Sequence, residues 1–204
     1  RLARADVVTA ADWAEVGAVN YLVIQFVVGF QGSSLIKKNG PLEIERAVGY
    51  VVQAAQGLAF AHGEGVIHRD IKPANLLLDK KGVGKILDMG LARIESSDDG
   101  LTATEQVMGT VDYMSPEQAA NTKVVDGRAD IYSLGCTLWF LLTGKKLYDA
   151  DTMIARLMAH RDGELPSLVK TRDDASWPLE QAFHKMIAKR AQDGYQSMQE
   201  GIAA

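Results

Sequence analysis

The pattern of apolar and polar residues predicts a mixed domain in which strands occupy the first part of the chain and long helices follow. Runs at 7–10 and 21–28 are rich in β-branched and aromatic residues, which is typical of strands. Two shorter apolar runs, 76–78 and 85–87, flank turn residues at 79–82 and predict a hairpin. These segments supply the β part of the fold.

Four further segments are predicted to be helical. They are residues 42–62, 130–142, 151–161 and 178–191. The run at 130–142 is apolar nearly all round, which is typical of a helix at the centre of a core. The apolar runs at 19–28 and 131–142 are shorter than the ~20 residues of a membrane span, so we interpret both as buried elements.

Composition indicates a globular protein. The 204 residues are 47% hydrophobic, and a net charge of −4 argues against a nucleic-acid or anionic-membrane surface. Cys136 has no second cysteine to pair with, which excludes an internal disulfide and suits a reducing compartment. The chain opens on Arg1 without a signal-peptide pattern, so we expect it to be a segment of a longer protein.

The densest group of chemically active residues is His-Arg-Asp-Ile-Lys-Pro-Ala-Asn at 68–75, where the proline predicts a loop rather than a continuous helix. A hairpin after this loop would bring Asp88 back beside Asn75. Asp70 and Lys72 would then lie around the same small volume. Two metal-ligand oxygens, one cation and one free carboxylate suit a magnesium-bound polyphosphate and an attacking hydroxyl. Singly, each aspartate reads as a turn residue, but the combination favours a catalytic site.

This pattern resembles the catalytic and magnesium loops of eukaryotic-type protein kinases, in which His-Arg-Asp, four residues and Asn are followed by Asp-Phe-Gly. Order and spacing match, with Met89 in place of Phe. Residues 107–110 and 130–135 are most similar to bacterial serine/threonine kinases. The resemblance implies an α+β, protein-kinase-like fold, mainly the helical large lobe with a remnant of the small-lobe sheet.

Roles for the site residues follow from the resemblance and from the needs of phosphoryl transfer. Asp70 would accept or orient the proton of the substrate hydroxyl, and Lys72 would place a positive charge on the transferred phosphate. Asn75 and Asp88 would bind Mg²⁺. Leu77 would lie under the adenine ring of ATP, although a plain core leucine is an equally good account.

The resemblance also divides the chain. Residues 1–28 would be the last two strands of the small lobe, and residues 29–204 the large lobe, with the catalytic loop at 68–75 and the activation segment at 88–117. The glycine-rich phosphate loop, the Val-Ala-Ile-Lys-type lysine and its partner glutamate are missing from the sequence.

The segment around residue 25 would form the hinge of such a kinase. Ile24 would lie at the back of the nucleotide pocket, and the backbone of Gln25 and Val27 would face the adenine edge. An ordinary buried hairpin remains the alternative for the side chains of Val23 and Phe26.

Residues 90–116 show neither the apolar spacing of a helix nor the alternation of a strand. A loop of this length is usually functional or disordered. The run at 108–117 resembles the kinase substrate-docking loop, closed by Ser-Pro-Glu, with Glu117 last. Thr110 together with Lys72 indicates serine or threonine acceptors.

Hydroxyl groups in the same segment suggest control by phosphorylation. Thr102 or Thr104, once phosphorylated, would be read by Arg69. This hypothesis rests on position alone, and unchanged activity after alanine replacement of both threonines would remove it.

Several other polar residues are expected to have supporting roles. Asp130 can cap the central helix, and the resemblance implies that it braces the catalytic loop. His62 is interpreted as a cap or surface residue rather than a ligand. His160 and His184 lack companions at metal-ligand spacing and are interpreted as surface residues.

Gly194 departs from the kinase pattern, because an arginine normally stands there and pairs with the glutamate equivalent to Glu117. Removing one partner of a buried ion pair can cost ~3–5 kcal/mol. Either Arg190 reaches across to Glu117, or Glu117 is hydrated and the substrate loop is looser.

Two functions are compatible with this sequence. The first is an ATP- and Mg²⁺-dependent serine/threonine protein kinase that phosphorylates protein hydroxyls in the cytoplasm, or in the cytoplasmic part of a membrane-anchored parent, with this piece weakly active alone. The alternative is a truncated pseudokinase that acts as a non-catalytic interaction module.

Overall fold

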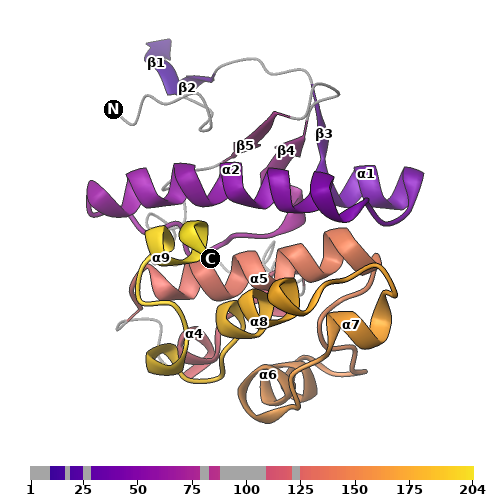
Figure 1. Cartoon of the computed structure of the whole chain (residues 1–204). Coiled ribbons are helices and arrows are strands. Elements are labelled where there is room, and N and C mark those ends of the chain that lie inside the picture. Colours follow the sequence, from indigo (N-terminus) through magenta and orange to yellow (C-terminus); the bar gives the residue numbers. More distant parts are fainter. Residues whose placement is uncertain (1–9, 17–18, 25–28, 79–82, 88–108, 121–124) are drawn as a thin grey trace.

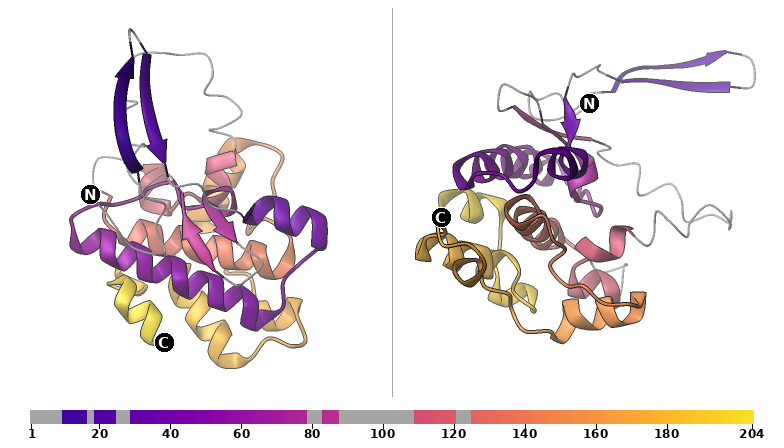
Figure 2. Two further views of the ribbon diagram at one scale, coloured as in Figure 1. Left: turned by 90° about the horizontal axis from the view of Figure 1, so that it is seen from above. Right: turned by 90° about the vertical axis from the view of Figure 1, so that its right-hand side faces the viewer.

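A computed structural model describes residues 10–16, 19–24, 29–78, 83–87, 109–120 and 125–204 of the chain (Figure 1). A helical body carries a small sheet on one side, and a separate hairpin extends away from the helices (Figure 2). In the described part of the chain, no helix combines the length and apolar character needed to cross a membrane.

The strands form two antiparallel sheets. In the hairpin, β1 (Ala10–Val16) pairs with β2 (Val19–Ile24). The second sheet has the order β3-β4-β5 and consists of β3 (Phe30–Gln31), β4 (Leu76–Leu78) and β5 (Gly84–Ile86). The hairpin predicted around residues 79–82 is confirmed by the pairing of β4 with β5, in which Leu77 lies opposite Lys85.

The helices and short 3₁₀ turns form the body of the molecule. They are α1 (Gly32–Asn39), α2 (Ile44–Gly63), η1 (Pro73–Asn75), η3 (Val111–Tyr113), α4 (Pro116–Ala120), α5 (Arg128–Thr143), α6 (Met153–Asp162), α7 (Leu168–Thr171), α8 (Trp177–Met186), η5 (Ala191–Asp193) and α9 (Met198–Ala203).

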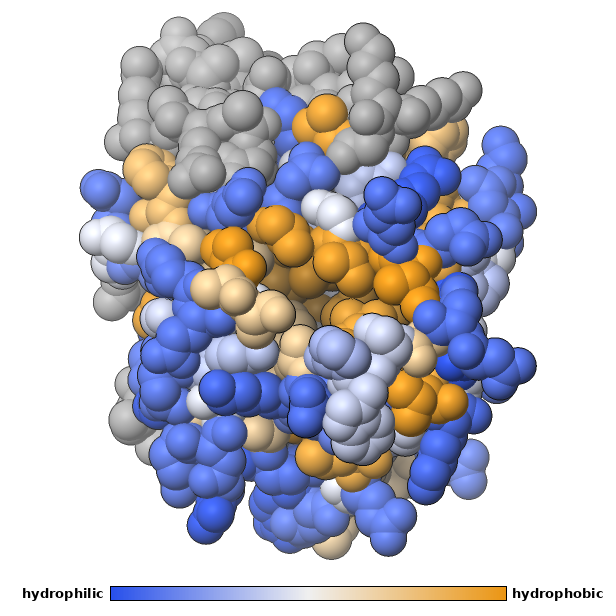
Figure 3. Space-filling model, in the orientation of Figure 1, coloured by the Kyte–Doolittle hydropathy of each residue, from blue (hydrophilic) through white to orange (hydrophobic). Residues whose placement is uncertain are grey.

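Helix α5 lies at the centre of the core, as its apolar sequence predicts. It runs between α2 and α8 (Figure 1), and nearly all of its side chains are buried. Aromatic stacking joins α5 to α8, since the rings of Trp139 and Phe183 lie 5.6 Å apart. On the face shown in Figure 3, apolar residues gather across the middle at the height of α2, with polar residues around them.

The first strand and the helix predicted at 178–191 differ most from the structure. Strand β1 covers Ala10–Val16 in the described residues, so it extends past the predicted run at 7–10 because it pairs with the whole of β2. Helix α8 ends at Met186 rather than 191. Beyond it, Lys189 donates hydrogen bonds to the carbonyls of Ala159 and His160 at the end of α6.

His160 is not the surface residue that its sequence context suggested. It is fully buried, its Nδ1 lies 2.9 Å from the hydroxyl of Tyr132, and its Nε2 has no hydrogen-bond partner. Burial lowers the pKa of His160 to about 4, helped by the nearby charge of Lys189, while Asp112 opposes the shift. The prediction failed because spacing along the sequence carries no information about which face of α6 is covered.

We expect His160 to make stability depend on pH. Because its folded pKa lies below the usual 6.5, the unfolded chain binds one more proton between about pH 6.5 and pH 4. The free energy of unfolding should therefore fall as the pH is lowered through this window, by about 1.4 kcal/mol per unit. Urea unfolding of the wild type and of His160→Gln across the window measures this slope. Equal slopes in both proteins would contradict the assignment.

Candidate active site

One buried carboxylate, that of Asp130, holds the backbone of the catalytic loop. Asp130 accepts hydrogen bonds from the backbone N–H of His68 at Oδ2 (2.9 Å) and of Arg69 at Oδ1 (2.8 Å). Arg69 has φ = 68°, a left-handed conformation that non-glycine residues adopt at a cost of ~1–2 kcal/mol. The predicted brace is therefore present. The predicted cap is wrong, because α5 begins at Arg128 and the carboxylate bonds the loop instead.

His62 completes this brace. Its Nε2 lies 2.8 Å from Oδ2 of Asp130, and its side chain is only 17% exposed, so its interpretation as a cap or surface residue is wrong. Its ring also packs on Gly127, where an added Cβ would lie 2.7 Å from the imidazole. No local pattern indicates this contact, because 68 residues separate His62 from Asp130.

Asp70 lies at the centre of a polar cluster on the open side of the loop. Its Oδ2 lies 2.8 Å from Nζ of Lys72 and accepts a hydrogen bond from Nδ2 of Asn75 (3.1 Å). Its Oδ1 accepts a hydrogen bond from Oγ1 of Thr110 (3.1 Å), which in turn accepts one from Lys72 (2.9 Å). The structure therefore brings four of the predicted residues together, and the side chain of Asp70 remains 29% exposed.

The amide of Asn75 is oriented in a way that suits a cation ligand. Its Nδ2 donates to Asp70, both to the backbone carbonyl (2.8 Å) and to the carboxylate, so Oδ1 is the atom left to bind a metal. The described residues contain no group of three or more His, Cys, Asp and Glu side chains able to hold a metal ion. Asp88, the second predicted ligand, lies outside the described residues.

The residue before Asp88 is anchored on both sides. The backbone N–H of Leu87 donates to the carbonyl of Asn75 (2.9 Å), and Nε2 of His68 lies 2.9 Å from the carbonyl of Leu87. The chain therefore passes directly beside the catalytic loop just before position 88.

The predicted nucleotide side is described only in part. Ile24 is the last residue of β2, whereas Gln25 and Val27 lie outside the described residues. Leu77 lies in β4, half-buried, opposite Gln31 of β3. Its Cγ would be 3.1 Å from a Cβ added to Gly29, so the chain entering β3 passes close over this leucine.

The segment after Thr110 is fastened to the helices below it. Asp112 is buried and pairs with Arg156 of α6 (2.7 Å) and with Lys146 (2.9 Å). Gln118 of α4 donates to the carbonyl of Arg69 (2.8 Å), which connects this segment to the catalytic loop. None of these residues was singled out from the sequence, because long separations along the chain leave no local pattern.

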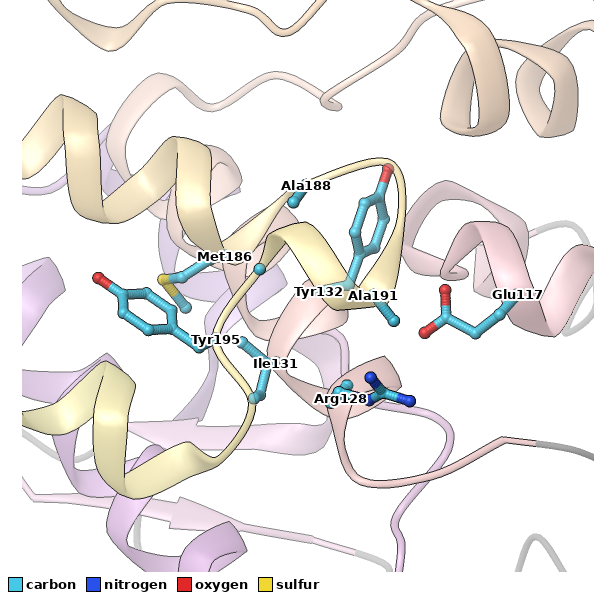
Figure 4. A pocket seen from close by; sticks show the side chains of 9 residues that line it. Glu117, Arg128, Ile131, Tyr132, Met186, Ala188, Ala191 and Tyr195 are labelled. Atoms are coloured by element: carbon cyan, nitrogen blue, oxygen red, sulfur yellow. The ribbon is translucent and has the colours of Figure 1, made fainter.

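Glu117 and Gly194 line one small cavity (Figure 4). Arg190 is not the substitute for the missing arginine, because its Nε pairs with Asp193 at 2.6 Å and its side chain is 70% exposed. Thr102 and Thr104 lie outside the described residues.

Comparison with known proteins decides the family. The model of the protein kinase domain matches residues 1–198. The chain belongs to the protein kinase domain family. This kinase domain is 37% identical over 201 residues to a probable serine/threonine-protein kinase of Clostridium acetobutylicum, covering 98% of this chain and 30% of that protein. It is 36% identical over 186 residues to the serine/threonine-protein kinase PknB of Mycobacterium tuberculosis, covering 90% and 29%.

The fold class is confirmed by a solved structure. The crystal structure of Rad53 residues 1–466 in complex with AMP-PNP superposes with a TM-score of 0.82 at 20% identity, covering 99% of this chain and 50% of that one. The kinase domain therefore has the predicted α+β fold, with the helical lobe and a remnant of sheet. It spans only about 30% of the length of the curated relatives named above.

Proposed function

We propose that this kinase domain transfers the γ-phosphate of ATP to serine or threonine hydroxyls of protein substrates. The observation that carries the proposal is the cluster in which Asp70 contacts Lys72 and Thr110. A carboxylate and an ammonium group side by side, partly exposed, suit a reaction that needs alignment and charge neutralisation more than covalent help.

Each side chain of the cluster has a role in this proposal. Asp70 orients the attacking hydroxyl and accepts its proton, while Lys72 stabilises negative charge on the transferred phosphoryl group. Thr110 holds Oδ1 of Asp70 until the substrate hydroxyl takes its place. The serine/threonine preference is supported by this hydrogen bond between the docking loop and the catalytic carboxylate.

Mg²⁺ and ATP fit the residues that the proposal assigns to them. Oδ1 of Asn75 is available as a ligand, and the anchoring of Leu87 supports Asp88 as its neighbour. The metal ion, when bound, neutralises charge on the phosphates. Leu77 would contact the adenine.

The hinge assignments extend this proposal to the other side of the nucleotide. Ile24, Gln25 and Val27 remain predictions for the hinge. The same holds for the division into a small-lobe remnant at 1–28 and a large lobe at 29–204.

We also propose how the domain is regulated, which substrates it meets and where it acts. Within the activation segment at 88–117, Thr102 and Thr104 would be phosphorylated and read by Arg69. The substrates would be proteins rather than nucleic acids, encountered in the cytoplasm or beside a membrane that holds a longer parent protein.

A truncated pseudokinase is the second candidate. It is favoured by Gly194, where the resemblance to kinases implies an arginine. The intact contacts among Asp70, Lys72 and Asn75 favour the enzyme instead.

We expect the 204-residue chain alone to bind ATP weakly and to turn over little, because half of the phosphate clamp is missing from its sequence. Titration with ATP and Mg²⁺ by calorimetry, together with phosphorylation of a generic protein substrate, measures both quantities. Robust phosphorylation by this chain would contradict the expectation while supporting the enzymatic function. If the full-length gene product fails to phosphorylate any serine or threonine substrate, the pseudokinase alternative is favoured.

A further inference from the structure

We propose that Arg128 replaces the arginine missing at Gly194 as the cation that faces Glu117, and so positions the substrate-docking loop. The inference rests on the proposed function for its consequence, although the electrostatic coupling between Glu117 and Arg128 can be tested without any enzymatic activity. It replaces the expectation that Arg190 fills this role.

The cavity between α4, α5 and η5 places these residues together. Glu117, Arg128 and Gly194 all line it, and Figure 4 shows the carboxylate of Glu117 and the guanidinium of Arg128 on the same side. Glu117 lies in the first turn of α4, whereas Arg128 is the first residue of α5. Hydrogen bonds to Asp126 raise the pKa of Arg128, and the charge of Glu117 adds to the shift.

Arg128 is fixed in place from two directions. Its Nε and Nη2 donate to Asp126, at 3.0 and 2.7 Å, while Nη1 donates to Oε1 of Gln196 at 3.1 Å. Gln196 in turn donates to the carbonyls of Ala191 (3.0 Å) and Gly194 (2.8 Å). The segment that lacks its own arginine is thus connected to Arg128 through one amide side chain.

Neighbouring backbone lies close to Gly194. A Cβ added there would lie 2.9 Å from the carbonyl oxygen of Lys185, closer than real contacts allow. A side chain at position 194 would require the neighbouring backbone to shift, whereas Arg128 lines the same cavity without any such change.

The consequence concerns the docking loop. Glu117 precedes Gln118, whose side chain donates to the carbonyl of Arg69 in the catalytic loop. On this proposal, a cation facing Glu117 holds α4 at the place where it contacts the catalytic loop, so the domain would keep its docking loop in position despite Gly194.

A double-mutant cycle on the 204-residue chain tests the pair. Urea unfolding of Glu117→Gln, Arg128→Gln and the double variant should show non-additive effects, with a coupling of about 2- to 5-fold in the unfolding equilibrium constant. The coupling should shrink in about 1 M salt, because the pair is partly exposed, and Arg128→Lys should retain part of it. The matched control is the cycle of Glu117→Gln with Arg190→Gln, which should be additive.

A second cycle tests the replacement itself. Gly194→Arg should be better tolerated, relative to the parent protein, in the Arg128→Gln background than in the wild type, because only there does Glu117 lack a cation. The cost of the added Cβ cancels in this comparison. Additivity in the Glu117–Arg128 cycle, or equal effects of Gly194→Arg in both backgrounds, would overturn the proposal. If Glu117 and Arg128 are coupled in the unfolding cycle but the full-length gene product phosphorylates no serine or threonine substrate, the proposed function fails while this proposal stands.

Discussion

Replacing Asp70 by Asn should lower kcat by about 10²- to 10⁴-fold, the range expected when a general base is lost. Asparagine keeps the shape of the side chain and can still accept the hydrogen bond of Thr110, but it has neither the charge nor the basicity of the carboxylate. The measurement is the phosphorylation rate of a serine-containing protein by the full-length gene product. The Michaelis constant for ATP should change little, because Asp70 faces the hydroxyl acceptor in the proposed reaction.

The control for this experiment is Asp162→Asn on the exposed end of α6, whose carboxylate pairs with its neighbour Arg161. This variant should keep the wild-type rate. Stability of Asp70→Asn should remain close to the wild type, since the carboxylate is partly exposed. A rate within a few-fold of the wild type for Asp70→Asn would contradict the assignment of Asp70 as the base.

Replacing Asp130 by Ala should destabilise the chain by about 3–5 kcal/mol. The carboxylate is fully buried and accepts hydrogen bonds from the backbone of His68 and Arg69, with His62 as its third partner. Truncation leaves the backbone N–H groups of His68 and Arg69 without this acceptor, and it releases the left-handed conformation of Arg69. Urea unfolding followed by circular dichroism measures the loss.

Asp130→Asn provides an intermediate case, because its amide oxygen can accept one of the bonds that the carboxylate accepts. It should cost less than Asp130→Ala. Asp162→Ala is again the exposed control and should change the free energy of unfolding by less than about 0.5 kcal/mol. A change of similar size for Asp130→Ala would show that the loop is held in another way.

The catalytic loop was predictable because its chemistry is local. Asp70, Lys72 and Asn75 lie within six residues, and the proline between them excludes a helix. The β4–β5 hairpin and the central helix α5 were equally accessible, since each depends on the apolar pattern of one short segment.

The supporting contacts were not predictable from the sequence alone. The bonds of His62 to Asp130 and of Asp112 to Arg156 join residues 68 and 44 positions apart. Such pairs depend on how the helices pack, and the spacing of residues along the chain does not reveal this packing. His160 was misread for the same reason, because only the packed structure shows that tyrosines and a lysine cover it.

The close packing of His62 on Gly127 limits how this domain can evolve. Any side chain at position 127 would collide with the imidazole, although the backbone there, at φ = −61°, is ordinary for every residue type. The collision would push the ring away from Asp130 and so loosen a loop more than fifty residues distant in the sequence. A side chain at position 127 would therefore disturb the support of the catalytic loop unless residue 62 became smaller or moved with it.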